Sequence, residues 1–129
     1  MPQTVEKGTA EIVARYVAVW NETDTESRRT DVEALWNSDA AEFVEGAAFR
    51  GHDELYGRID RAHEQFVASG LYTATAATDV SQHDDIVTFT IQLTSPEEEV
   101  AWAARVFLLL DGDGVIREDY QLTVKALAA

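Results

Sequence analysis

Residues 101–124 constrain the fold more than any other part of the sequence, because they hold two strand-like segments joined by an Asp-Gly-Asp-Gly turn. Such a turn is typical of a β-hairpin. Alternation along the first segment places Trp102, Val106 and Leu108 on one face and Phe107 and Leu109 on the other. Since both faces are apolar, both sides of this sheet are expected to be covered.

The second segment carries polar side chains within what should be sheet. Alternation predicts one face with Ile116, Tyr120, Leu122 and Val124, and an opposite face with Arg117, Asp119, Gln121 and Thr123. Because the preceding strand leaves neither face freely solvated, the polar face is expected to line a pocket.

The first half of the chain predicts three helices. Apolar residues recur with a helical period from Val5 to Trp20, which predicts a helix ending near Asn21. A second helix of about three turns carries apolar side chains through Trp36, while its charged residues, Arg28 among them, are expected to be mostly solvated. A third helix is predicted over residues 53–68, with Ser69-Gly70 as its stop signal.

The second half predicts a sheet. A short strand over residues 41–45, closed by Gly46, precedes the third helix. Four longer strands over residues 71–81, 86–94, 100–110 and 115–125 are separated by turn signals, which predicts an antiparallel meander. Helices followed by strands favour the α+β class, because a parallel sheet would need the two to alternate.

Composition and charge limit the function. The 129 residues, 46% of them hydrophobic, suffice for one domain. A formal net charge of −14 would repel nucleic acid and anionic lipid, so neither is expected as a partner. The lack of Cys excludes disulfides and thiolate chemistry. With no membrane-spanning apolar run and no signal-peptide pattern, a cytoplasmic location is expected.

Four short motifs carry a family likeness. They are Ala14-Arg15-Tyr16, Leu35-Trp36-x-x-Asp39-Ala40, Arg50-Gly51-His52, and Val106-Phe107-Leu108 with Asp113-Gly114-x-Ile116. With the order of predicted elements, they resemble the nuclear-transport-factor-2-like superfamily, and within it the SnoaL-like group of polyketide cyclases and ketosteroid isomerases. The resemblance spans nearly the whole chain. It implies a cone-shaped barrel in which a curved, mostly antiparallel sheet packs against three N-terminal helices around an internal pocket.

The resemblance does not transfer steroid isomerase activity. Tyr16 falls at the place of the oxyanion-hole Tyr of ketosteroid isomerases. The position of the isomerase base corresponds to Val44 or to Glu42, depending on the direction of counting. The second oxyanion donor, an Asp in the isomerases, corresponds to Val106. One scaffold carries unrelated chemistries, so function has to be argued from the site.

Asp119 is the first candidate catalytic residue. If it faces the pocket among Trp102, Val106 and Phe66, desolvation would raise its pKa toward the range of a general acid or base. The alternative is an exposed carboxylate paired with a neighbouring arginine. Gln121, on the same face, would bond a ligand carbonyl, or else satisfy Asp119 or the backbone.

His63 and Tyr16 are the other catalytic candidates. A neutral His63 at the edge of the third helix's apolar stripe would move a proton or orient a substrate; otherwise it is a satisfied or exposed histidine. Tyr16 lies on the buried stripe of the first helix, one turn before Trp20, and its hydroxyl needs a partner. If that partner is Asp119, His63 or Glu42, these groups form a polar network inside an apolar cup.

Glu42 and Phe43 alternate, so one of them points inward. Hydrophobicity favours Phe43, whereas the family resemblance favours Glu42. The full set of expected ligand-binding residues is Glu42, Gln121, Trp20, Phe66, Trp102 and Val106. The three His lack ligand spacing, so no metal site is expected.

These residues predict a pocket for a small, mainly apolar organic molecule. As an enzyme, the protein would use no cofactor and would catalyse isomerisation, cyclisation, dehydration or water addition by proton transfer, with Asp119 as base and Tyr16 stabilising negative charge. The alternatives are a binding module without turnover and an assembly platform with a filled core. A homodimer is expected because the outward strand face is apolar. The residues on that face are Phe107, Leu109, Tyr120, Leu122 and Val124.

Overall fold

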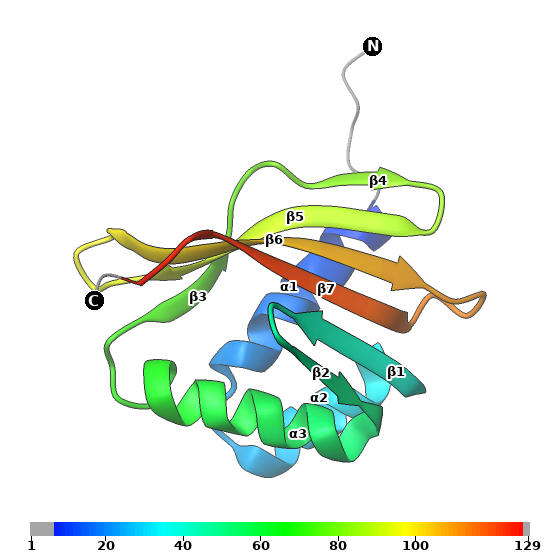
Figure 1. The fold of residues 1–129 in the computed structure, drawn as a ribbon, viewed down its shortest axis with the longest axis horizontal. Coiled ribbons are helices and arrows are strands. Elements are labelled where there is room, and N and C mark those ends of the chain that lie inside the picture. Colours follow the sequence, from blue (N-terminus) through cyan, green and yellow to red (C-terminus); the bar gives the residue numbers. More distant parts are fainter. Residues whose placement is uncertain (1–6, 128–129) are drawn as a thin grey trace.

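The computed structural model describes residues 7–127, which form three helices packed on a curved sheet of seven strands (Figure 1). The helices are α1 (Lys7–Asn21), α2 (Thr25–Leu35) and α3 (Gly51–Ala62), the last continued by a π-helical turn, η1 (His63–Val67). The strands are β1 (Trp36–Val44), β2 (Ala47–Arg50), β3 (Thr73–Ala76), β4 (Ser81–His83), β5 (Ile86–Thr94), β6 (Val100–Leu110) and β7 (Ile116–Lys125).

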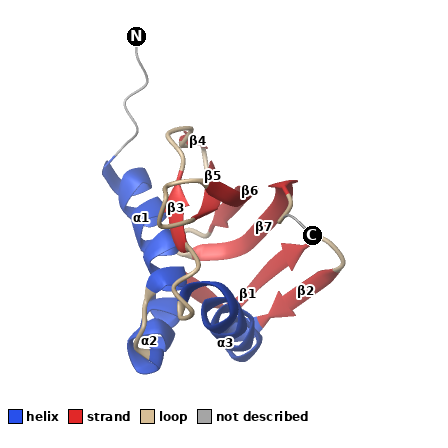
Figure 2. Cartoon of the chain, turned by 90° about the vertical axis from the view of Figure 1, so that its left-hand side faces the viewer, coloured by secondary structure: helices blue, strands red, loops and turns tan. Residues whose placement is uncertain are grey.

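The sheet has the order β2-β1-β7-β6-β5-β3, and β4 pairs with β5 at the same edge as β3. Every pairing is antiparallel except that of β1 with β7, which is parallel. Figure 2 shows the sheet curving around the helices, which lie on one side of it. The predicted α+β class and the mostly antiparallel curved sheet are therefore confirmed, and the sheet stays open between β2 and β3.

The helices differ from the prediction at their ends. The first helix ends at Asn21 as expected, whereas Val5 lies outside the described residues. The carboxylate of Asp24 accepts a hydrogen bond from the backbone N–H of Ser27 and caps α2. Trp36 does not continue the second helix but begins β1.

The strands differ more. β1 begins five residues earlier than the predicted start at residue 41, and β2 was not predicted. The turn between them contains Gly46 at φ +82°, a conformation that glycine adopts at little cost. The predicted strand over residues 71–81 is two strands, because between them Asp79 leaves the ladder and accepts hydrogen bonds from the backbone N–H and hydroxyl of Thr90.

A β-bulge decides which way β7 faces. Leu109 pairs with Glu118 but Leu110 pairs with Ile116, so β7 contains one extra residue at this point. Ile116 and Asp119, three positions apart, are consequently both fully buried on the inner face. The prediction that Ile116 shares a face with Tyr120 and Leu122 is therefore wrong.

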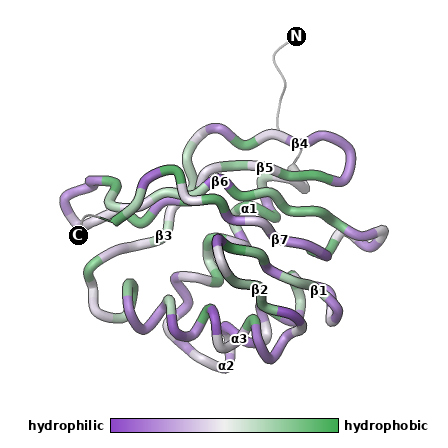
Figure 3. Tube along the Cα trace, in the orientation of Figure 1, coloured by the Kyte–Doolittle hydropathy of each residue, from purple (hydrophilic) through white to green (hydrophobic). Residues whose placement is uncertain are grey.

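The core lies between the inner face of the sheet and the helices. Its largest fully buried side chains include Trp36, Tyr16 and Phe89, and Tyr16 contacts the other two rings at centroid distances of 5.4 and 5.6 Å. Figure 3 shows that hydrophobic residues concentrate along β5 and β6, in the middle of the sheet. Across residues 7–127, no helix is both long and apolar enough to cross a lipid bilayer.

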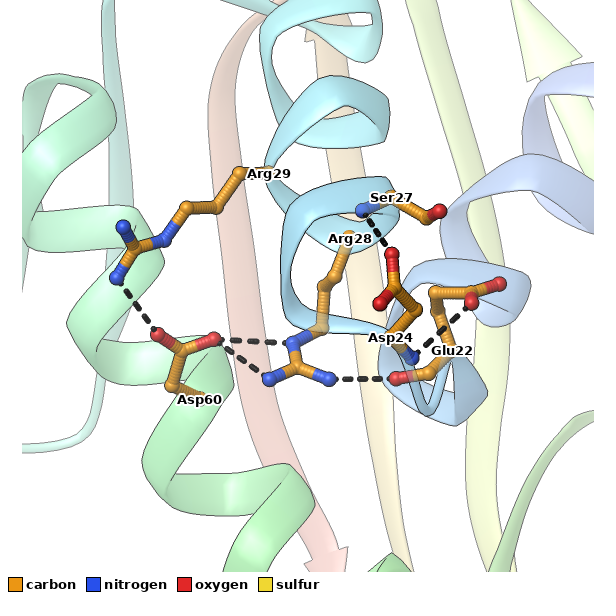
Figure 4. Close-up of polar contacts among 6 residues, drawn as sticks. All are labelled: Glu22, Asp24, Ser27, Arg28, Arg29 and Asp60. Carbon is orange, nitrogen blue, oxygen red and sulfur yellow. Dashed lines mark hydrogen bonds and ion pairs between the residues drawn. The ribbon is translucent and has the colours of Figure 1, made fainter.

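One charged residue of α2 is also buried. Arg28 was expected to be solvated, but it is 5% exposed. Its guanidinium bonds the carboxylate of Asp60 on α3 and the backbone carbonyl of Glu22, as Figure 4 shows. Arg28 therefore ties α2 to α3 and to the end of α1, and its charge is compensated.

Candidate functional site

Five polar side chains from four elements meet on the inner side of the sheet, and we refer to them as the buried polar network. Its members are Tyr16 of α1, Glu42 of β1, Arg58 of α3, and Asp119 and Gln121 of β7. Tyr16, Glu42 and Asp119 are completely buried, and Gln121 is 4% exposed. Asp119 is therefore not the exposed strand carboxylate that sequence alone left open.

Tyr16 and Asp119 are directly bonded. The phenol hydroxyl donates to the carboxyl of Asp119, with oxygen–oxygen distances of 2.8 and 3.1 Å. The same hydroxyl accepts a hydrogen bond of 2.6 Å from the side-chain amide of Gln121. The Tyr16 hydroxyl thus has both a donor and an acceptor partner, as a buried phenol requires.

Glu42 and Asp119 are neighbours because β1 and β7 pair in parallel, with the two residues at the same register position. Glu42 points inward, while Phe43 points outward and stacks on Tyr120 at a centroid distance of 5.0 Å. The inward residue is therefore the one that the family resemblance favoured. Hydrophobicity alone favoured the other, because it takes no account of a cation on another element that pairs with the carboxylate.

That cation is Arg58. Its Nε lies 3.0 Å from Glu42 Oε1, and its Nη2 donates to Gln121 Oε1 at 3.3 Å. The guanidinium also lies over the Trp20 ring, 5.3 Å from its centroid. Sequence reasoning missed Arg58, although its spacing of three residues after Leu55 and four before Ala62 places it within the apolar stripe of α3. A charged residue in such a stripe was the available signal.

The network raises two pKa values. Burial, followed by the charge of Glu42 and a hydrogen bond with it, raises the pKa of Asp119 well above its usual value. Burial and the charges of Asp119 and Glu42 likewise raise the pKa of Tyr16, which favours the neutral phenol. Two adjacent carboxyl groups cannot both ionise at low cost, and Glu42 is the one paired with Arg58. Asp119 is therefore the group that favours its protonated form.

A cavity of about 230 Å³ opens beside this network. Its residues are Trp20, Arg58, Ala62, His63, Phe66, Val67, Ala74, Ile91, Leu93, Trp102, Gln121 and Leu127. The wall is largely apolar, and Arg58 and Gln121 belong to both the wall and the buried polar network. A mainly apolar cavity with a few convergent polar groups is the usual form of a small-molecule site.

The predicted site residues divide into two sets. Trp20, Phe66, Trp102, Gln121 and His63 line the cavity. The others, Asp119, Tyr16, Glu42 and Val106, are not among its lining residues. Val106 is instead a fully buried core residue opposite Gln121 in the β6–β7 pairing, and Asp119, Tyr16 and Glu42 lie in the network behind the wall.

His63 begins the π-helical turn and is 6% exposed. Burial, together with the nearby charge of Arg28, lowers the pKa of its imidazole, and this effect outweighs the opposite influence of Asp60 and Glu22. The neutral imidazole is thereby favoured. Within residues 7–127, no group of three or more His, Asp or Glu side chains is placed to hold a metal ion.

Comparison with known proteins identifies the fold. No protein-family model matches the sequence, and no curated protein matches it. A SnoaL-like family protein from Agrobacterium tumefaciens, described as a candidate isomerase, is 22% identical with a TM-score of 0.82, covering 92% of this chain and 98% of that one. A Catenulispora acidiphila protein with a ketosteroid isomerase-like fold, solved with trimethylamine, is 20% identical with a TM-score of 0.63 and coverages of 86% and 83%.

A third similar structure was designed de novo. This nuclear-transport-factor-2 fold protein is 17% identical with a TM-score of 0.71, and the match covers 93% of this chain and 87% of the designed one. At such identities the likeness establishes the fold and no activity.

Proposed function

We propose that this chain, which has the nuclear-transport-factor-2-like fold, binds a small, mainly apolar organic molecule in the cavity between α1, α3 and the sheet. The observation that carries the proposal is the junction of that cavity with the buried polar network at Arg58 and Gln121. Buried polar groups are costly unless they are hydrogen-bonded, and the hydrogen bond between the buried Gln121 and the partly buried Arg58 lies in the cavity wall, where a ligand would meet it.

Filling the cavity tests this proposal. Ala62 lines the cavity from α3, so Ala62→Phe places a ring in the space that a ligand would occupy. Ala68, just after η1, is exposed and is not a lining residue, so Ala68→Phe is the matched control. In a screen of small apolar compounds by ligand-observed NMR, binding should be lost in Ala62→Phe alone. If both variants bind as the unmodified chain does, or no compound binds any of the three, the proposal fails.

Cofactor-free acid–base catalysis is the second candidate function. It is favoured by a His63 whose pKa is lowered at the cavity wall and an Asp119 whose pKa is raised behind it. Tyr16 and Asp119 lie behind the wall, so in this proposal the Gln121 amide that bonds the Tyr16 hydroxyl moves aside when the substrate binds. Asp119 then exchanges a proton with the substrate, as acid or base, through its contact with Tyr16, which stabilises developing negative charge. Isomerisation, cyclisation, dehydration and water addition are the reactions that such a set could perform.

Turnover separates catalysis from binding. A panel of enolisable ketones and epoxides is incubated with the unmodified chain and with Asp119→Asn, whose fold is checked by circular dichroism. Catalysis predicts pH-dependent turnover that Asp119→Asn abolishes. Ligand binding without turnover across the panel would leave only the binding function.

We also propose that two copies of this chain associate through the outer face of the sheet. Leu122 and Val124 of β7 are 50% and 66% exposed, and Phe107, Leu109 and Tyr120 lie alongside them, half-buried. Apolar side chains gathered on the outer side of a sheet are typical of an interface between subunits.

A further inference from the structure

The polar side chains that line the cavity carry more unpartnered hydrogen-bond donors than unpartnered acceptors. Trp20 lines the cavity and is 7% exposed, and its indole Nε1 is buried without a hydrogen-bond partner among residues 7–127. An indole N–H can only donate. A buried donor without a partner is costly, so an acceptor on a ligand that displaces the atoms now covering Nε1 would be favourable.

Arg58 contributes further donors. A guanidinium carries several N–H groups in a fixed fork and no acceptor. In the described part of the chain, Arg58 uses Nε for Glu42 and Nη2 for Gln121, which leaves Nη1 without a hydrogen bond. Arg58 and Trp20 both line the cavity, and the position of the guanidinium over the Trp20 ring brings these donors close to the indole.

The remaining polar groups supply few acceptors. The Gln121 oxygen already accepts from Arg58, and the Gln121 amide already donates to Tyr16 and Glu42. His63 Nε2, which is buried and also unpartnered within residues 7–127, donates or accepts according to its tautomer. The carboxylate of Glu42 lies behind the wall and is engaged by Arg58.

We propose that Arg58 and Trp20 form the donor end of the cavity and select ligands that present an acceptor oxygen, a carbonyl or carboxylate, on an apolar body. This inference rests on the proposed binding function and adds the class of ligand to it. A protonated amine would meet the Arg58 cation and the indole N–H of Trp20 instead of an acceptor, so it is selected against. The apolar lining residues, among them Phe66 and Leu93, match the apolar body of such a ligand.

Four probes that share one skeleton test the selection: phenylacetone, phenylacetate, 2-phenylethylamine and propylbenzene. Binding of each to the full chain is measured by NMR titration. The ketone, the carboxylate or both should bind more tightly than the amine and the hydrocarbon, and the two oxygen-bearing probes show which kind of acceptor is preferred. Tighter binding of the amine would overturn the proposal.

Two variants locate the donors. Trp20→Phe keeps a ring but removes the N–H, and should weaken the preferred oxygen-bearing probe about five- to tenfold while leaving propylbenzene unaffected. Phe66→Leu is its control, since it also shortens a ring of the cavity wall but removes no donor, and should affect all probes alike. The double variant Arg58→Met with Glu42→Gln avoids an unpaired buried carboxylate and should also remove the preference, whereas Arg61→Met, at an exposed position of α3, should not.

The outcomes separate the two proposals. If the four probes bind but their order is the same in Trp20→Phe and in the double variant, the donor assignment is wrong and the binding function stands. If none of the probes binds the unmodified chain, ligand binding at this cavity fails as well.

Discussion

The hydroxyl of Tyr16 lies 2.8 Å from the carboxyl of Asp119, and both side chains are completely buried. The two residues are 103 positions apart in the sequence, so this bond exists only because the sheet curves around α1 and both side chains are buried on its inner side (Figure 2). It links the first helix to the last strand within the buried polar network. The following predictions test this contact, its electrostatics and the surfaces around it.

Removal of the hydroxyl should destabilise the fold. Tyr16→Phe removes the hydroxyl that donates to Asp119 and leaves the Gln121 amide only its longer bond of 3.4 Å to Glu42, which costs about 1–3 kcal/mol for buried groups. Urea denaturation measures the loss of unfolding free energy. Tyr72→Phe is the control, because the structure gives the Tyr72 hydroxyl no hydrogen bond within the described residues. Equal stability of the two variants would show that the contact contributes nothing.

The raised pKa of Asp119 should make stability depend on pH. Because the folded state binds this proton more tightly than the unfolded state does, the contribution of Asp119 is fully present below its unfolded pKa of about 4. It is lost as the pH rises through the raised folded pKa. The unfolding free energy of the unmodified chain should therefore decrease with rising pH relative to that of Asp119→Asn, which cannot ionise. A difference between the two proteins that is constant with pH would contradict the shift.

His63 should titrate below the usual histidine pKa of about 6.5. Burial and the Arg28 charge disfavour its cationic form, against the weaker influence of Asp60 and Glu22. The neutral imidazole thus stabilises the fold above pH 6.5 or so, and this stabilisation is lost as the pH falls through the folded pKa. NMR titration of the imidazole protons, assigned with His63→Gln, measures the midpoint. A midpoint at or above that of an unfolded histidine would show that the pKa of His63 is not lowered by the fold.

Arg28 and Arg29 form a matched pair for testing how α2 is held to α3. Both bond Asp60, but the side chain of Arg28 is 6% exposed and that of Arg29 is 53% exposed. Arg28→Met should cost about 2–3 kcal/mol of unfolding free energy, because it removes charged hydrogen bonds to Asp60 and to the Glu22 carbonyl (Figure 4). Arg29→Met should cost less than about 1 kcal/mol. Thermal or urea denaturation measures the stability of the two variants. Equal losses would mean that burial does not strengthen the ion pair of Arg28 with Asp60.

The outer face of β7 should carry the subunit interface. Val124→Lys places a charge among the exposed apolar residues of β7 and should convert a dimer into monomers. Light scattering after size-exclusion chromatography gives the mass of each species. Leu71→Lys is the control, since Leu71 is 54% exposed but precedes β3. A monomeric unmodified chain would end the dimer proposal.

Much of the fold could be predicted from the sequence because helices and strands have different periods. The stripe of α1 ends where predicted, at Asn21, and β5 and β6 have the predicted bounds. These segments are long and strongly patterned, so local chemistry specifies them. The errors occur where an extra residue reverses which face of the strand the following side chains point to. The bulge between Ile116 and Glu118 is such a place, and alternation along a single strand cannot reveal it.

The candidate site was only partly predictable for a related reason. Tyr16, Asp119 and Gln121 could be identified as polar residues in apolar surroundings, and Trp20, Phe66 and Trp102 as aromatic residues of the core side. Arg58 was missed because its helix position alone does not show which carboxylate it meets. Its partner Glu42 lies on a different element, and hydrophobicity argued for the burial of Phe43 instead.

By itself, the sequence determined the elements, their class and which residues stand out chemically, since periodicity and turn residues act over a few neighbouring positions. Tertiary structure alone decided which of those residues meet. The parallel pairing of β1 with β7 places Glu42 beside Asp119, and the packing of α1 and α3 adds Tyr16 and Arg58. Contacts between distant segments depend on which elements become neighbours in space, and the pattern within any one element does not contain that information.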